Sequence, residues 1–255
     1  MIKVSIITVT YNSALYVKDC LESVSAQKYN NIEHIVIDGA STDETLSFIK
    51  SKRYNLKTLI SEPDQGIYDA MNKGINIAKG DIIGFLNSDD FYVNSEVISK
   101  VVNVFNNNPS LDACYADLIY TDQINVYKNI RYWKSGEFIP GSFSKGWCPP
   151  HPTFFVRDHV YKKFGNFNLN YHIASDVDLM MRFLEVNKIK VRYIPELWVK
   201  MRMGGLSNQS IKNIIKVNKE ILSALNSYNL PKNPLIFFAY KIISRLKQFI
   251  RKLYS

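Results

Sequence analysis

Residues 61–90 most constrain what this chain can fold into. They read SEPDQGIYDAMNKGINIAKGDIIGFLNSDD and contain the pattern of an amphipathic helix followed by a short apolar run. The apolar run, residues 82–86, is typical of a strand that is covered on both faces, as in a parallel sheet. Asp89 and Asp90 come directly after this strand. We therefore expect both acids at the sheet edge where open α/β folds bind their ligands.

Two neighbouring carboxylates are costly to hold in the ionised state unless a positive charge lies between them. A hard divalent cation that carries a phosphorylated ligand would supply that charge. The alternative interpretation is a solvated acidic turn before the next helix, which requires no ligand.

The N-terminal half of the chain alternates strand and helix patterns. Strand patterns occupy 4–10, 32–38, 56–61, 82–86 and 112–120, and helical patterns occupy 14–27, 43–52, 66–79 and 95–107. This alternation predicts an α/β fold with a mainly parallel sheet and helices on both faces. Further on, we expect hairpins or loops over 127–147, strands at 153–156 and 191–195, and helices at 157–163, from 175, at 207–227 and at 234–253.

The composition indicates a folded protein in a reducing compartment. Hydrophobic residues make up 46% and aromatic residues 13% of the chain, which is typical of globular proteins. The three cysteines are odd in number and lack the spacing of metal ligands, so we expect no disulfide framework. The first ten residues lead into a strand pattern without a cleavage site, so we do not interpret them as a signal peptide.

The positive charge is concentrated near the C-terminal end. The formal net charge is +9, and residues 206–255 contain nine Lys and Arg but a single acid. Residues 1–205 are almost neutral, with 23 basic and 22 acidic residues. A basic tail on a neutral globular part argues against a general nucleic-acid binder, so we expect no nucleic-acid partner.

Polar residues also follow the first two predicted strands. The first strand ends in Thr10, Tyr11 and Asn12 and lacks both a Rossmann glycine fingerprint and a P-loop. The second strand ends in Asp38, whose carboxylate could accept the N3–H of a uracil while Tyr11 covers the ring. In the alternative interpretation, Asp38 is only a turn residue before the next helix.

Six motifs in this order resemble those of the family 2 glycosyltransferases. The motifs are TYN at 10–12, DGASTD at 38–43, DAMNKG at 69–74, NSDD at 87–90, HPTFFVR at 151–157 and ASDVD at 174–178. The resemblance covers about residues 1–205 and is nearest to the bacterial branch that builds cell-surface polysaccharides. It implies a GT-A fold, a nucleotide-sugar donor, a divalent metal ion (Mn²⁺ or Mg²⁺) and inversion at the anomeric carbon.

The resemblance also suggests roles for individual residues. Asp38 is similar to the residue that binds the base. Asp89 and Asp90 are similar to the metal motif, with Asp89 nearer the ribose, Asp90 nearer the metal ion and Ser88 beside them in the nucleotide site. Asn87 departs from the family, because many relatives carry the first acid of an Asp-x-Asp pattern there. Its amide can accept a hydrogen bond from a ribose hydroxyl but adds no charge.

Asp176 resembles the catalytic base of the family. Ser175 and Asp178 suit the N-cap and N3 positions of a helix, which would place Asp176 in the first turn. The positive end of the helix would favour the ionised carboxylate, and a base must be ionised to take a proton from the acceptor hydroxyl. The alternative interpretation is an acid that only complements the helix dipole.

Further residues have two interpretations each. Residues 10–12 belong to the expected nucleotide site, and Asp64 and Lys73 either approach the nucleotide or only solvate a helix. His151 lies between prolines and either lines the acceptor pocket, approaches the diphosphate or is structural. Trp147 either stacks on a sugar ring or packs in the core.

The last predicted helix, about 234–253, is basic and amphipathic. Its apolar face holds Leu235, Phe238, Ala239, Ile242, Leu246, Phe249, Ile250 and Leu253, and the opposite face holds Lys241, Arg245, Gln248 and Lys252. Charges interrupt it too often for a bilayer span, which needs about 20 mostly apolar residues. It suits an anionic membrane surface, or alternatively packs on the domain or on a second subunit.

The sequence therefore predicts a glycosyltransferase domain at 1–205 and C-terminal helices at 206–255. We expect metal-dependent transfer of a hexosyl or N-acetylhexosaminyl group from a nucleotide-diphosphate sugar, a UDP-sugar, to a hydroxyl of a lipid-linked saccharide or polysaccharide. The expected location is the cytoplasm, peripheral on the inner face of the cell membrane. The alternatives are a non-catalytic sugar-nucleotide-binding subunit and a membrane-associated adaptor.

Overall fold

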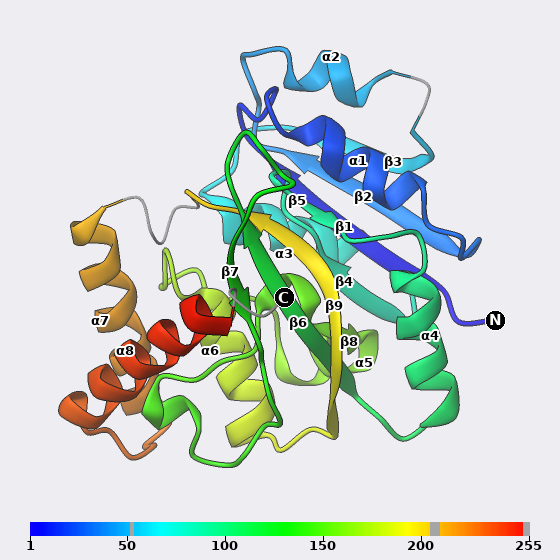
Figure 1. The fold of residues 1–255 in the computed structure, drawn as a ribbon. Helices are drawn as coiled ribbons and strands as arrows, with labels where there is room; N and C mark the ends of the chain where they lie inside the picture. Colours follow the sequence, from blue (N-terminus) through cyan, green and yellow to red (C-terminus); the bar gives the residue numbers. More distant parts are fainter. Residues whose placement is uncertain (52–53, 205–209, 252–255) are drawn as a thin grey trace.

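The computed structural model describes residues 1–51, 54–204 and 210–251. Nine strands in this part form one sheet, with helices packed on its faces (Figure 1). The strands are β1 Val4–Thr10, β2 Ile32–Asp38, β3 Leu56–Ser61, β4 Ile82–Phe85, β5 Asp90–Tyr92, β6 Ala113–Thr121, β7 Asn129–Trp133, β8 Phe155–Arg157 and β9 Val191–Arg202. Their order is β3-β2-β1-β4-β8-β6-β9-β5, with β7 paired to β6.

The N-terminal half of the sheet is parallel. β1 pairs in parallel with β2 and β4, and β2 pairs in parallel with β3. This arrangement confirms the predicted α/β fold, because the helices between these strands act as crossovers. Antiparallel pairs of β5, β7 and β8 complete a mixed sheet on the other side.

The sequence did not predict β5 or the full length of β9. β9 continues past Pro195 to Arg202 along β6, with a register shift opposite this proline. A bulge tolerates proline because the ladder hydrogen bond is already interrupted there. The end of β9 then pairs with β5, so that Met201 lies opposite Asp90. The C-terminal end of β9 therefore lies beside Asp89 and Asp90.

The helices lie largely where the sequence predicts them. They are α1 Val17–Ser25, α2 Thr45–Ile49, α3 Ile67–Ile77, α4 Val97–Asn107, α5 Asp158–Phe164, α6 Ser175–Met181, α7 Ile211–Ser227 and α8 Pro234–Arg251. A π-helical turn, Arg182–Val186, extends α6. Short 3₁₀ turns η1 and η2 lie at Phe143–Lys145 and His151–Thr153.

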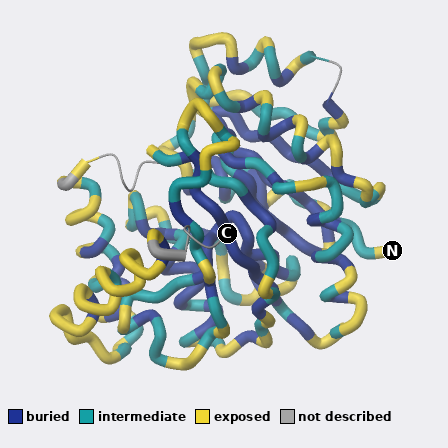
Figure 2. Tube along the Cα trace, in the orientation of Figure 1, coloured by how far each residue is buried: buried dark blue, intermediate teal, exposed yellow. Residues whose placement is uncertain are grey.

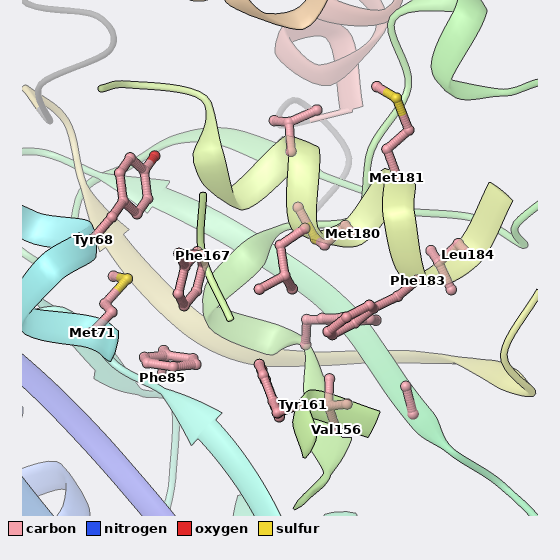
Figure 3. Packing of buried hydrophobic residues seen from close by; sticks show 14 of the residues in the cluster. Tyr68, Met71, Phe85, Val156, Tyr161, Phe167, Met180, Met181, Phe183 and Leu184 are labelled. Carbon is pink, nitrogen blue, oxygen red and sulfur yellow. The ribbon is translucent and has the colours of Figure 1, made fainter. Parts of the chain in front are cut away.

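The apolar layer between the sheet and α3, α5 and α6 supports the edge where β1 and β4 end. In Figure 3, Phe167 lies between Tyr68 of α3 and Phe85. The ring centroid of Phe167 is 5.5 Å from that of Tyr68 and 5.3 Å from that of Phe85. Full burial of such a side chain stabilises the fold by about 1.5–3 kcal/mol. Buried aromatic side chains therefore pack beneath the ends of these strands.

The helix α8 lies on the surface against β7 and η1, and much of its length is exposed (Figure 2). Phe237 is its fully buried anchor. Among the described helices, none is long and apolar enough to cross a membrane.

Candidate active site

A cavity of about 1140 Å³ opens where β1 and β4 end. These two parallel strands are neighbours, so the loops that follow them meet at one edge of the sheet. The predicted site residues that line the cavity are Thr10, Tyr11, Asn12, Asp64, Ser88, Asp89, His151 and Asp176. Asp38, Lys73, Asp90 and Trp147, also predicted, are not among its lining residues.

Asp176 lies in the first turn of α6 and faces the cavity. The hydroxyl of Tyr68 donates a hydrogen bond of 3.0 Å to Oδ1 of Asp176. Burial and the negative charge of Asp176 raise the pKa of Tyr68 well above its usual value, so this hydroxyl keeps its proton. The predicted cap at Ser175 is wrong, since α6 begins at this residue and its hydroxyl donates to the carbonyl of Asn168.

The two acids after β4 have different surroundings. Asp89 lines the cavity, whereas Asp90 is 0% exposed within β5. Burial raises the pKa of Asp89, and burial together with the charge of Asp89 raises the pKa of Asp90 well above its usual value. Asp90 is not part of the cavity lining, and its role as the acid nearest the metal ion stays a prediction.

The residues around Asp89 suit a hard cation that is shared with a phosphorylated ligand. Within the described residues, no cluster of three or more His, Cys, Asp or Glu could hold a metal ion. However, Mg²⁺ in phosphate-binding sites often uses only one or two carboxylates and takes its other ligands from phosphate oxygens and water. Oδ1 of Asn87, two residues before Asp89, and Oδ1 of Asp90 are both buried without a hydrogen-bond partner in the described part of the chain. Asp89 and Asn87 could therefore hold such an ion.

The carboxylate of Asp38 is used by the turn that follows β2. It accepts hydrogen bonds from the backbone N–H of Ser41 at 2.9 Å and from the hydroxyl of Ser61 at 2.7 Å. Asp38 is fully buried, which agrees with its interpretation as a turn residue and not with the predicted contact to a base. Asp64 is the acid that lines the cavity near Tyr11, whose ring is 63% exposed.

Asn12 adopts a left-handed backbone conformation with φ at 47°. Its Oδ1 accepts a hydrogen bond of 2.9 Å from the backbone N–H of Thr42. Such a conformation is uncommon outside glycine and is often found at functional sites. The bond joins the loop after β1 to the loop after β2 and fixes this wall of the cavity.

Hydrogen bonds and ring contacts show the surroundings of three other predicted site residues. Lys73 pairs with Glu62 at 2.8 Å and donates to a backbone carbonyl, so it holds the loop before α3. Trp147 donates from Nε1 to the carbonyl of Ser135 at 2.7 Å and packs among buried rings, as its core interpretation expects. His151 lines the cavity and stacks on Phe85, and burial lowers its pKa, so that a neutral imidazole is favoured.

The sequence did not predict two further parts of the cavity wall. Arg202, at the end of β9, is buried and donates to the backbone carbonyl of Asp89 at 2.8 Å. Residues of α7 and α8 also line the cavity, including Asn218, Lys241 and Arg245. The basic residues of α8 are visible in the sequence, where they predict either a membrane-binding helix or one that packs on the domain.

Comparisons with known sequences point to one family. The family model described as Glycosyl transferase family 2 matches residues 5–177. A PGL/p-HBAD biosynthesis glycosyltransferase of Mycobacterium bovis strain BCG is 32% identical over 226 residues, which span 87% of this chain and 83% of the relative.

Solved structures share the fold at lower sequence identity. S. aureus TarS 1–349 in complex with UDP has a TM-score of 0.64 and 21% identity, covering 90% of this chain and 67% of that one. The mannosyltransferase PcManGT from Pyrobaculum calidifontis, in complex with GDP-Man and Mn²⁺, has a TM-score of 0.67 and 18% identity, covering 92% and 67%. These likenesses confirm the predicted GT-A fold.

Proposed function

The chain belongs to glycosyl transferase family 2, and from this premise we propose that it is an inverting enzyme of cell-surface glycan synthesis. The donor is a nucleotide-diphosphate sugar, a UDP-sugar, and the acceptor is a hydroxyl of a lipid-linked saccharide. One observation carries the proposal: Asp89 and Asp176, far apart in sequence, line the same cavity.

The donor half of the proposed site is the wall formed by the loops after β1 and β4. The exposed ring of Tyr11 can stack on a base, and the carboxylate of Asp64 can accept a hydrogen bond from it. Asp89 lies toward the ribose and diphosphate. A divalent cation, Mn²⁺ or Mg²⁺, held by Asp89 and Asn87 would offset negative charge on the diphosphate. The Mn²⁺ and GDP-Man bound by the mannosyltransferase PcManGT support this assignment.

Asp176 acts in the proposed reaction as the general base. Its carboxylate takes the proton of the acceptor hydroxyl while that oxygen attacks the anomeric carbon. The bond from this carbon to the diphosphate breaks on the opposite face, and the nucleoside diphosphate leaves. The hydrogen bond from Tyr68 fixes the orientation of the carboxylate. A carboxylate that is already oriented lowers the activation free energy, because less entropy is lost on reaching the transition state.

The tail in this proposal keeps the enzyme peripheral on the inner face of the membrane. Large apolar side chains on α8 are exposed, among them Ile243 at 49% and Leu246 at 58%. A helix with such a face can lie in the lipid interface. We assign the transferase domain to 1–205 and this attachment to 206–255. A lipid-linked acceptor would then lie close to the catalytic cavity.

A donor screen tests the proposed function. Purified protein is incubated with UDP- and GDP-sugars and Mn²⁺ or Mg²⁺, and release of the nucleoside diphosphate is measured with and without a lipid-linked saccharide extract. We expect slow release of UDP from one donor, accelerated by acceptor and lost in Asp176→Asn. A sugar-nucleotide-binding subunit without catalysis would release no nucleotide from any donor, and that result would contradict the proposal.

A further inference from the structure

The helix α8 turns Lys241 toward the protein and leaves much of its apolar surface exposed. Phe237 and Gln248 are buried, and Lys241 lies between them on the same side, half-buried. Leu246 and Ile243 point outward. An amphipathic helix that packs on a soluble domain normally does the reverse and buries its apolar stripe. The inward position of Lys241 therefore calls for an explanation other than attraction to lipid headgroups.

Lys241 is held in place by uncharged groups. Its Nζ donates a hydrogen bond of 2.6 Å to Oδ1 of Asn218, and it lies 5.1 Å from the centroid of the Phe237 ring. Asn218 is 8% exposed and donates from Nδ2 to the carbonyl of Ile214, so its oxygen is fixed toward Lys241. No ion pair of Lys241 is found in the described part of the chain. The carboxylate of Asp176, which lines the same cavity, favours the charged form of Lys241 without pairing with it. A half-buried ammonium that lacks a paired anion is costly.

A second cation lies one helical turn further along. Arg245 lines the cavity together with Lys241 and Asn218. Like charges four residues apart repel each other on a helix. Burial, and to a lesser degree Arg245, lowers the pKa of Lys241. An anion in the cavity would relieve both the burial cost and the repulsion. A phosphate group suits this position, since it accepts several charge-assisted hydrogen bonds at once.

We infer that Lys241 and Arg245 bind a phosphate group of a substrate inside the catalytic cavity. The inference rests on the proposed function, because it places this phosphate in the cavity that contains Asp89 and Asp176. Two sources have the required chemistry: the diphosphate of the donor, and the phosphate that joins an acceptor saccharide to its lipid. The wall beside the two cations contains Ile242 and Phe238, so it can also accept an apolar chain.

The test compares two double variants that remove the same charge. Lys241→Met with Arg245→Met removes the cavity pair, and Lys232→Met with Lys247→Met removes two exposed cations that do not line the cavity. Binding of UDP, pyrophosphate and decyl phosphate is measured by calorimetry, with decyl glucoside as the uncharged probe. We expect the cavity variant to bind at least one phosphate ligand about tenfold more weakly, while decyl glucoside and the exposed variant are unaffected.

The pattern of loss identifies the source of the phosphate. Weaker binding of UDP and pyrophosphate indicates the donor, and weaker binding of decyl phosphate alone indicates the acceptor. Unchanged affinities, equal losses in the exposed variant, or no binding of any phosphate by the wild type would overturn the inference. Arg245→Met alone, at an exposed position, should reproduce part of the loss even where the double variant fails to fold. Nucleotide release by the wild-type protein separately decides the proposed function.

Discussion

Asp89 and Asp90 are adjacent in the chain, yet only Asp89 lines the cavity. We expect Asp89→Asn to weaken Mn²⁺-dependent UDP binding about tenfold or more, because a carboxylate ligand is replaced by an uncharged amide. Calorimetry with UDP, in the presence and absence of Mn²⁺, measures the change. Asp90→Asn is the matched control and should leave the affinity within about threefold. The opposite pattern would assign the metal role to Asp90 in place of Asp89.

Variants of Tyr68 and Asp176 should change the rate of transfer and leave donor binding unchanged. Asp176→Asn should lower kcat about 10²- to 10⁴-fold, the usual contribution of a general base, without a comparable loss of UDP affinity. Tyr68→Phe should lower kcat about tenfold and leave KM for the donor unchanged, because it removes only the hydrogen bond that orients Asp176, the proposed base. Initial rates of UDP release measure both effects. Normal turnover in the asparagine variant would exclude Asp176 as the base.

At the scale of elements, the ends of the parallel strands could be predicted from sequence. Thr10 and Asp89 each follow an apolar run, and parallel strands bring such ends to one edge. The bonding of Asp38 to its own turn could not be predicted, because burial and hydrogen-bond partners depend on the complete fold. Arg202 was missed because proline usually ends a strand pattern, whereas β9 continues past Pro195 through a bulge.

The helix α8 could be predicted as amphipathic, but its orientation could not, because periodicity does not specify which side a domain covers. Its outward apolar side predicts membrane binding. Ile243→Ser with Leu246→Ser should lower the binding constant for anionic liposomes, measured by sedimentation, by about 30-fold or more, since each change removes about 1–2 kcal/mol of apolar burial in lipid. Neither residue lines the cavity, so UDP affinity should not change. Full sedimentation of this variant would contradict a membrane role for α8.

At the scale of the whole molecule, the cavity is formed by segments from both ends of the chain. Strand ends from the first 90 residues form one wall, and α7 and α8 form part of the other. The neutral transferase part and the basic tail therefore contribute to a single site. Membrane contact on one side of α8 and substrate contact on the other would place a lipid-linked acceptor close to Asp176.

The stability of the whole fold should depend on pH through His34. This side chain is 1% exposed in β2, and its Nε2 is 3.0 Å from the hydroxyl of Thr8. Burial lowers the pKa of His34 from 6.5 to about 3. Between these values the unfolded chain binds a proton that the folded chain does not, so the free energy of unfolding falls as the pH falls.

The expected contribution of His34 to this loss is about 2 kcal/mol between pH 7.5 and pH 5. Urea denaturation at the two pH values measures it. His34→Gln keeps a hydrogen-bonding group near Thr8 but cannot titrate, so this variant should lose about 2 kcal/mol less than the wild type over the same interval. Other acidic groups affect both proteins alike and cancel in the comparison. Equal losses in the two proteins would show that His34 is protonated in the folded state or is reached by water there.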